Sequence, residues 1–259
     1  MILGAQLYTL RAKLTTLEGL DAMLKAVADM GYKAVQLSGI SCEYTPEWIA
    51  DKCREYGLEI ALTHIEYNEF VNNIDKVIAD HKIMGCKYVG LGCFPNFREL
   101  TEEAMLEYLT ALKPSLEKLK ANGMKFMYHN HDVEFGRPAK DRPIFFDTML
   151  KKMPAELFGV TLDMYWVQAG GADCAVWLHK MADRAHCVHL KDMIYDMAER
   201  KPHYAPIGYG NMNYAAVVKA CEEIGTEYAF VELDSTYGED PLDCLKKSYE
   251  YLSTTFGLR

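Results

Sequence analysis

Several features are missing from this 259-residue sequence, and each absence excludes a class of protein. No run of about eighteen or more apolar residues occurs, so we predict no membrane-spanning helix. A basic excess is also missing, because 28 lysines and arginines stand against 37 aspartates and glutamates, for a formal net charge of −9. Nucleic acid and anionic membranes require a basic face, so we expect neither as a partner. The N-terminus has no basic segment followed by a long apolar one, so we expect no signal peptide.

The eight cysteines show no Cys-x-x-Cys spacing. Cys86, Cys187 and Cys221 lie in or beside apolar runs, where a free cysteine behaves as a small hydrophobic residue. We therefore predict reduced, structural cysteines and a cytoplasmic protein, in preference to a disulfide framework.

Short β-prone segments alternate with helical patterns along the whole chain, without a linker or a low-complexity tract. Half of the residues are hydrophobic, which is enough to bury a large core. Helical spacing of apolar residues indicates helices over 17–28, 46–57, 70–84, 101–119 and 242–252, and Pro114 should kink or break the fourth of these. The expected strands are 2–8, 33–37, 58–63, 87–91, 124–129, 158–162, 186–190 and 228–233.

Eight strands alternating with eight helices predict an α/β protein with a parallel sheet. This count and the chain length favour a single domain, residues 1–259, folded as a (β/α)8 TIM barrel. The alternative is an open doubly wound sheet, which usually has a glycine-rich phosphate turn after its first strand. The segment Leu7-Tyr8-Thr9-Leu10-Arg11 has no such turn.

Polar side chains follow four successive strands, where the C-terminal strand ends of a barrel converge on one mouth. His129 and His131 end the fifth strand and should point the same way, because alternate side chains of a strand share a face. A single polar strand end could simply be exposed to solvent without a functional role. Four in succession offer a mixed nitrogen and oxygen ligand set for one divalent cation, which could be manganese, cobalt, magnesium or zinc. The later strands contribute Asp163, His189 with Lys191, and Glu232.

Several motifs resemble those of the xylose-isomerase-like barrel enzymes, which include ketose 3-epimerases, hydroxypyruvate isomerases and inosose dehydratases. The resemblance extends over nearly the whole chain, and its motifs together are specific for the family but not for a substrate. They are Gln6-Leu7-Tyr8-Thr9-Leu10-Arg11, Tyr128-His129-Asn130-His131-Asp132-Val133-Glu134-Phe135, Leu162-Asp163-Met164-Tyr165-Trp166-Val167, Ala169-Gly170-Gly171, His189-Leu190-Lys191-Asp192, Ile207-Gly208-Tyr209-Gly210-Asn211 and Val231-Glu232-Leu233-Asp234.

The resemblance implies that Asp163, His189 and Glu232 are metal ligands. The family's first ligand is a glutamate from the fifth strand, and here His129 stands in its place. Either His129 is the ligand or Glu134 supplies the carboxylate.

The resemblance also implies a metal-dependent sugar isomerase or epimerase that removes a proton next to a carbonyl. Among the family's epimerases this chemistry commonly uses two ligand-associated carboxylates, so His129 puts a symmetric pair in doubt. A histidine base such as His131 suits β-elimination instead, which makes a lyase or dehydratase acting on a keto-sugar, keto-glycoside or inosose the second hypothesis. Candidate catalytic residues are His131, Glu134, Lys191 and Glu232.

Other strand-end residues are candidates for binding a sugar or polyol, or for packing within the barrel. They are Gln6, Tyr8, Gln36, His64 and Trp166. The segment 195–205 is either a lid or a subunit contact, so a homo-oligomer remains open. Two other classes compete: a DNA-repair endonuclease, which the acidic balance disfavours, and a non-catalytic sugar-binding barrel.

Overall fold

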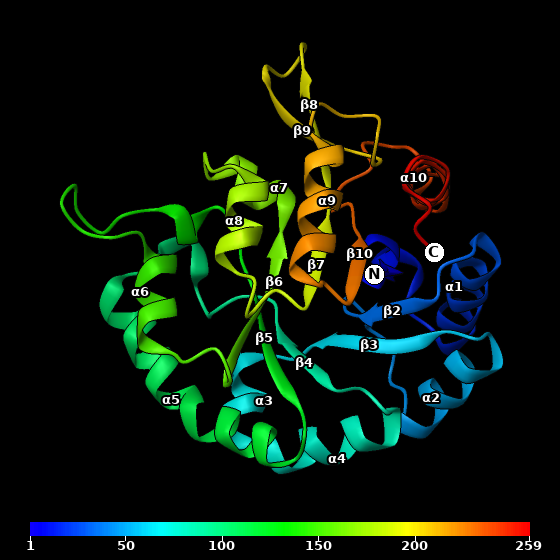
Figure 1. The fold of residues 1–259 in the computed structure, drawn as a ribbon. Coiled ribbons are helices and arrows are strands. Elements are labelled where there is room, and N and C mark those ends of the chain that lie inside the picture. Colours follow the sequence, from blue (N-terminus) through cyan, green and yellow to red (C-terminus); the bar gives the residue numbers. More distant parts are fainter.

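The computed structural model describes residues 1–259, and its centre is a closed barrel of eight parallel strands (Figure 1). The strands follow one another around the ring in chain order, and the first pairs with the last to close it. The predicted (β/α)8 barrel is therefore confirmed. The strands are β1 (Ile2–Gln6), β2 (Ala34–Leu37), β3 (Glu59–His64), β4 (Tyr88–Leu91), β5 (Lys125–His129), β6 (Phe158–Asp163), β7 (Cys187–Leu190) and β10 (Tyr228–Val231).

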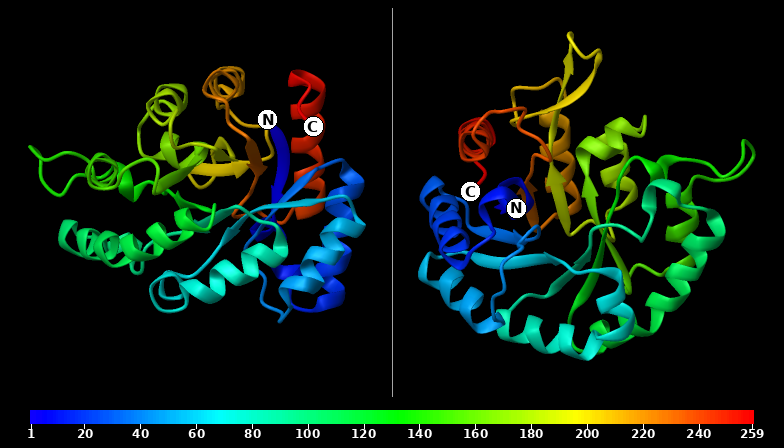
Figure 2. Two further views of the ribbon diagram at one scale, coloured as in Figure 1. Left: turned by 60° about the horizontal axis from the view of Figure 1, so that its bottom comes forward. Right: turned by 180° about the vertical axis from the view of Figure 1, so that it is seen from behind.

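Helices cover the outside of the barrel (Figure 2), and no helix is both long and apolar enough to cross a membrane. The two chain ends lie side by side, where the Leu3 amide donates to the Arg259 carbonyl oxygen at 3.0 Å. The helices are α1 (Leu17–Met30), α2 (Pro46–Glu55), α3 (Tyr67–Asn72), α4 (Ile74–Met84), α5 (Glu102–Ala121), α6 (Phe145–Lys152), α7 (Met164–Ala169), α8 (Cys174–Lys180), α9 (Tyr214–Ile224) and α10 (Pro241–Phe256).

Two expectations about the helices were wrong in part. The single helix predicted over 70–84 is a pair, α3 and α4, divided at Asn73. Pro114 does not break α5, which continues through it. Leu109, Leu112 and Leu116 are buried on both sides of the proline, so packing against the barrel offsets the hydrogen bond that the proline cannot donate.

The interior of the barrel is packed, and this places the site at one end. Alternate residues of a strand share a face, so Met127 lies below His129, Cys187 below His189 and Phe230 below Glu232. Met127, Cys187 and Phe230 belong to a buried cluster of eight hydrophobic residues. The donor side chains His129, His189 and Glu232 therefore lie above this hydrophobic layer, at the C-terminal mouth.

The segment predicted as an insertion forms an antiparallel hairpin, β8 (Asp192–Asp196) and β9 (Lys201–Ala205), which projects beyond the barrel (Figure 1). Its base is fixed by Asp192, whose carboxylate accepts hydrogen bonds from the amides of Gly208 and Gly210 at 2.9 and 3.1 Å. A Cβ atom on Gly210 would collide with this carboxylate. The Gly208-Tyr209-Gly210 turn therefore packs closely against Asp192.

Candidate active site

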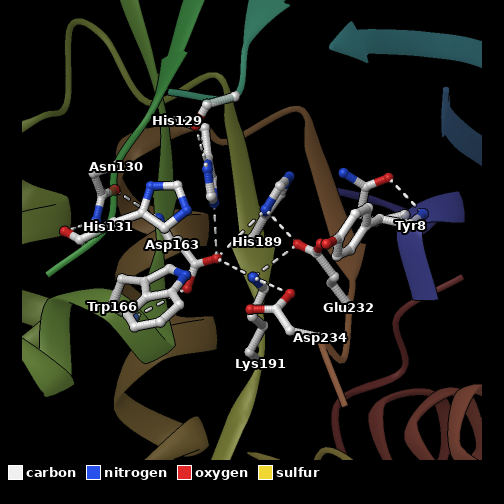
Figure 3. A network of polar contacts seen from close by, with 12 residues as sticks. Tyr8, His129, Asn130, His131, Asp163, Trp166, His189, Lys191, Glu232 and Asp234 are labelled. Carbon is white, nitrogen blue, oxygen red and sulfur yellow. Dashed lines mark hydrogen bonds and ion pairs between the residues drawn. The ribbon is translucent and has the colours of Figure 1, made fainter. Parts of the chain in front are cut away.

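Four buried side chains converge at the mouth from four consecutive strand positions around the barrel (Figure 3). Each comes from the last inward-facing position of its strand, or from the residue just beyond it. Their candidate ligand atoms all lie within 4.8 Å of one another, and none of the four residues is more than 4% exposed. We call them the donor group: His129 from β5, Asp163 from β6, His189 from β7 and Glu232 after β10.

The centre of the donor group is one oxygen atom, Asp163 Oδ2. It lies 3.0 Å from His129 Nε2 and 3.5 Å from His189 Nδ1. His189 Nδ1 also lies 2.9 Å from Glu232 Oε2. The other carboxylate oxygen of Asp163 caps α7 by accepting from the Trp166 amide at 3.1 Å, so the helix start fixes the carboxylate.

The outer nitrogens of both histidines are already bonded, which leaves the inner nitrogens facing carboxylates. His129 Nδ1 lies 3.0 Å from the Gly92 carbonyl oxygen, and His189 Nε2 lies 2.6 Å from Gln36 Oε1. Both partners are acceptors, so each outer nitrogen donates its N–H to them, and the inner nitrogen is the one that can offer a lone pair to a metal.

Two buried atoms of the donor group, His189 Nδ1 and Glu232 Oε2, lie 2.9 Å apart without the geometry of a hydrogen bond, and Glu232 Oε2 also lies 3.0 Å from Lys191 Nζ. Buried polar atoms are normally satisfied, so two orphans facing each other need an explanation. A proton or a metal cation between the ring and the carboxylate removes the repulsion that a lone pair there would cause. Burial lowers the pKa of His189, but the carboxylates of Glu232 and Asp163 outweigh burial and raise that pKa overall. Two imidazole nitrogens and two carboxylate oxygens fit a divalent cation, and His129, His189 and Asp163 are each oriented by a hydrogen bond on the far side.

Lys191 supplies a further positive charge at the same place. Its ammonium lies 3.1 Å from Asp163 Oδ2, 3.0 Å from Glu232 Oε2 and 2.9 Å from Asp234 Oδ1, and the side chain is only 2% exposed. Burial alone would lower the pKa of Lys191, but the three carboxylates hold that pKa well above its usual range. Lys191 is therefore a fixed cation, which makes it a donor and not a base.

The same contacts keep two carboxylates ionised in the interior. Burial alone would raise the pKa of both Asp163 and Glu232. Lys191 and the neighbouring histidines outweigh burial and hold both pKa values below the usual range. Both side chains are thus anionic at neutral pH, as metal ligands must be.

His131 lies beyond the end of β5, with its ring centre 4.8 Å from that of His129. The ring is held between Phe97 and Trp166, whose centres are 4.5 and 5.2 Å away, and its Nδ1 has no hydrogen-bond partner. Burial lowers the pKa of His131 well below its usual value, and nearby His129 and Lys191 add to that effect. The imidazole is therefore neutral and able to accept a proton.

Glu134 does not join the donor group. Its carboxylate is fully buried and accepts from the Tyr128 hydroxyl at 2.5 Å and from the His131 amide at 2.8 Å. Burial raises its pKa to about 7. Of the two candidates for the remaining metal ligand, His129 and Glu134, the geometry therefore favours His129. Glu134 stabilises the turn that carries His131.

An open cavity of about 420 Å³ lies over the donor group, within the size range of small-molecule sites. Of the residues expected to bind substrate, Tyr8, His64 and Trp166 line it. Gln6 and Gln36 do not, because both are fully buried beneath it.

Sequence reasoning missed several residues of this site. Asp234 is two positions after Glu232, and this spacing on one face was a usable signal. Asn130 is buried and accepts from the Asp163 amide through Oδ1 at 3.0 Å. Phe97, Arg98 and Tyr204 also line the cavity, but they come from a loop and from the hairpin, and no local pattern marks them.

Comparisons with known proteins agree with this fold. A family model described as xylose isomerase-like TIM barrel matches residues 24–254. An inosose dehydratase from Geobacillus kaustophilus (strain HTA426) is 26% identical over 201 residues, which cover 69% of this chain and 64% of that protein, so the chain spans less than two thirds of that relative.

Solved structures share the fold at lower identity. A sugar phosphate isomerase/epimerase from Parabacteroides distasonis ATCC 8503 superimposes with a TM-score of 0.84 at 22% identity, over 99% of this chain and 95% of that one. The IolI protein, solved with a zinc atom bound, has a TM-score of 0.70 at 16% identity, over 98% of this chain and 97% of its own.

Proposed function

The chain belongs to the xylose isomerase-like TIM-barrel family, and from this premise we propose that it is a divalent-metal-dependent sugar isomerase or epimerase. The reaction removes a proton next to the carbonyl of a keto- or aldo-sugar. The observation that carries the proposal is the donor group, buried beneath an open cavity with orphaned atoms facing one another. The names of the similar proteins, an inosose dehydratase and a sugar phosphate isomerase/epimerase, point to small sugar or polyol substrates.

A cation held by the donor group would polarise the substrate oxygen and stabilise the negative charge of an enediolate. Manganese, cobalt, magnesium and zinc all suit two nitrogen and two oxygen ligands. Charge balance supports a bound cation, because Asp163 and Glu232 are both held ionised and share the single positive charge of Lys191.

His131 is the proposed base. It is neutral, it lines the cavity, and its Nδ1 is unpartnered. Phe97 and Trp166 hold the ring on either side, which fixes its orientation toward a bound sugar. Lys191 also lines the cavity, and its ammonium would donate a hydrogen bond to a substrate oxygen as negative charge develops there.

The second candidate is a lyase or dehydratase, and the residue at the end of β5 favours it. With His129 in the donor group in place of a glutamate, the symmetric pair of ligand-associated glutamates is incomplete, so a symmetric two-base epimerisation lacks one of its groups. One imidazole and one ammonium suit elimination. The imidazole takes the proton next to the carbonyl, a carbon–carbon double bond forms, and the β-hydroxyl leaves with a proton as water. The similarity to an inosose dehydratase points the same way.

Solvent exchange and product analysis test the proposal. Turnover of a keto-sugar in deuterium oxide should place deuterium at one carbon of an isomerised product, because the abstracted proton mixes with solvent. A product lighter by one water supports the second candidate. Turnover without any exchange would overturn proton abstraction and favour a hydride shift.

Metal analysis tests the alternative of a non-catalytic sugar-binding barrel. Purified protein should contain about one divalent ion per chain and lose turnover on chelation. Sugar binding that persists with neither bound metal nor turnover would overturn the enzyme assignment.

A further inference from the structure

A glutamine from the opposite half of the barrel touches the donor group. Gln36 is on β2, and its Oε1 lies 2.6 Å from Nε2 of His189 on β7, two strands that do not pair with each other. Both side chains are fully buried. The bond therefore crosses the barrel interior, below the cavity and out of reach of substrate.

This bond decides which nitrogen of His189 is offered to the site. An amide oxygen only accepts, so the proton of a neutral ring stays on Nε2 and the lone pair stays on Nδ1, which faces Asp163 and Glu232. With a donor in place of the amide oxygen, Nε2 would become the acceptor. The proton would move to Nδ1, between the ring and Glu232, and would block that nitrogen as a ligand.

His129 has a corresponding partner in the Gly92 carbonyl oxygen, which is backbone and needs no particular side chain. His189 has no such backbone acceptor, since its Nε2 contacts only Gln36. Its ligand nitrogen thus depends on one side chain that sequence reasoning assigned to the substrate.

We propose that Gln36 is a positioning residue that fixes His189 with Nδ1 toward the metal, and not a substrate contact. The inference rests on the proposed metal site and names a residue on which the metal affinity of that site depends. Partners of metal-bound histidines typically change affinity by about 10–100-fold when removed.

The neighbouring glutamine provides a matched control. Gln6 pairs with Gln36 in the register of β1 and β2, is equally buried, and also has an unpartnered Nε2. Its Oε1 accepts from the Tyr8 amide and not from the donor group. A Gln6→Leu variant therefore reproduces the loss of a buried amide without touching His189.

The experiment measures zinc affinity by calorimetry for the wild type and for Gln36→Leu, Gln36→Glu and Gln6→Leu. Gln36→Leu should bind about 10–100-fold more weakly. Gln36→Glu keeps an acceptor at the same place and should bind at least as tightly as the wild type. Gln6→Leu should change zinc affinity by less than about threefold, and thermal melting should show comparable stability for the two leucine variants.

Nitrogen-15 NMR of the zinc-loaded protein supplies a second measurement. The Nε2–H proton of His189 should exchange slowly with solvent in the wild type and in Gln36→Glu, and rapidly in Gln36→Leu.

Different failures identify different errors. A wild type that does not bind zinc or another divalent ion would overturn the metal site itself. If the wild type binds zinc and Gln36→Leu binds it with equal affinity, only the positioning role of Gln36 is overturned. Equal losses in Gln36→Leu and Gln36→Glu would also overturn it, because the cause would then be packing or a donated hydrogen bond.

Discussion

The two ends of the barrel both carry clustered charged and aromatic polar groups, but only one end leaves them without partners. At the N-terminal end, Lys125 Nζ lies 2.6 Å from His186 Nε2, and Glu227 accepts from Lys87 and from the Tyr88 hydroxyl, both at 2.6 Å. At the C-terminal mouth, His189 and Glu232 are among the residues with buried, unpartnered atoms, and none of the N-terminal cluster is.

Nearly all of the orphaned side-chain atoms belong to the mouth. Thr161 is the exception, and it lies within β6, two positions before Asp163. The remaining residues stand at strand ends or just beyond them: Gln6, Gln36, His64, His131, Asp132, Trp166, His189 and Glu232. Buried polar groups are usually hydrogen-bonded to protein or water, so the unpartnered atoms mark the mouth as the place where a bound species completes the hydrogen bonding, whereas the partly exposed groups at the base pair with one another.

Among the variants that test this contrast, removal of the Asp163 carboxylate should have the largest effect on metal binding and turnover. Asp163→Asn should abolish detectable metal binding and turnover, because Oδ2 faces both histidines and Lys191. Asp163→Ala should do the same and cost about 1 kcal/mol more of unfolding free energy, since asparagine still caps α7 and alanine does not. Metal analysis and denaturant melts measure both effects. A variant with full metal content would contradict the assignment.

The proposed base should matter next. His131→Ala should retain metal and fold but lose on the order of 10²–10⁴ in kcat, the usual effect of removing a general base. The ring accepts no side-chain hydrogen bond that the fold depends on. Near-normal turnover with a lowered melting temperature would show instead that His131 only packs between Phe97 and Trp166.

Substitutions at the N-terminal end of the barrel should lower stability and leave activity unchanged. Glu227→Ala removes the contacts to Lys87 and Tyr88 and should cost about 1–2 kcal/mol of unfolding free energy. Metal affinity and kcat should stay at wild-type values. A change in either would mean that the two ends are coupled through the barrel, and the contrast between them would fail.

The smallest effect is a pH dependence at the base. Burial and the neighbouring Lys125 lower the pKa of His186 in the folded protein. The unfolded chain takes up the proton first as pH falls below about 6.5, so this contribution to stability is present above that pH and is lost below it. His186→Asn should therefore show a shallower loss of stability between pH 7 and pH 5, by at most about 1.4 kcal/mol per pH unit. Identical slopes in denaturant melts would contradict a lowered pKa of the half-buried His186.

The sequence by itself determined the barrel, because its signals are local and repeated. Alternating β-prone and helical segments, with caps such as Thr101 and the stop at Gly31, specify each element from neighbouring residues. The strand ends also marked His129, Asp163, His189 and Glu232, since the topology of a parallel barrel brings all strand C-termini to one mouth.

Only the tertiary structure decided how those residues divide their work. Glu134 and His129 were equal candidates until the turn after β5 directed the Glu134 carboxylate to Tyr128. Gln36 and His189 are 153 positions apart, and no local pattern connects them. Which nitrogen faces which oxygen depends on distances across the barrel interior, and these are set by packing and closure of the whole ring, not by any segment of the chain.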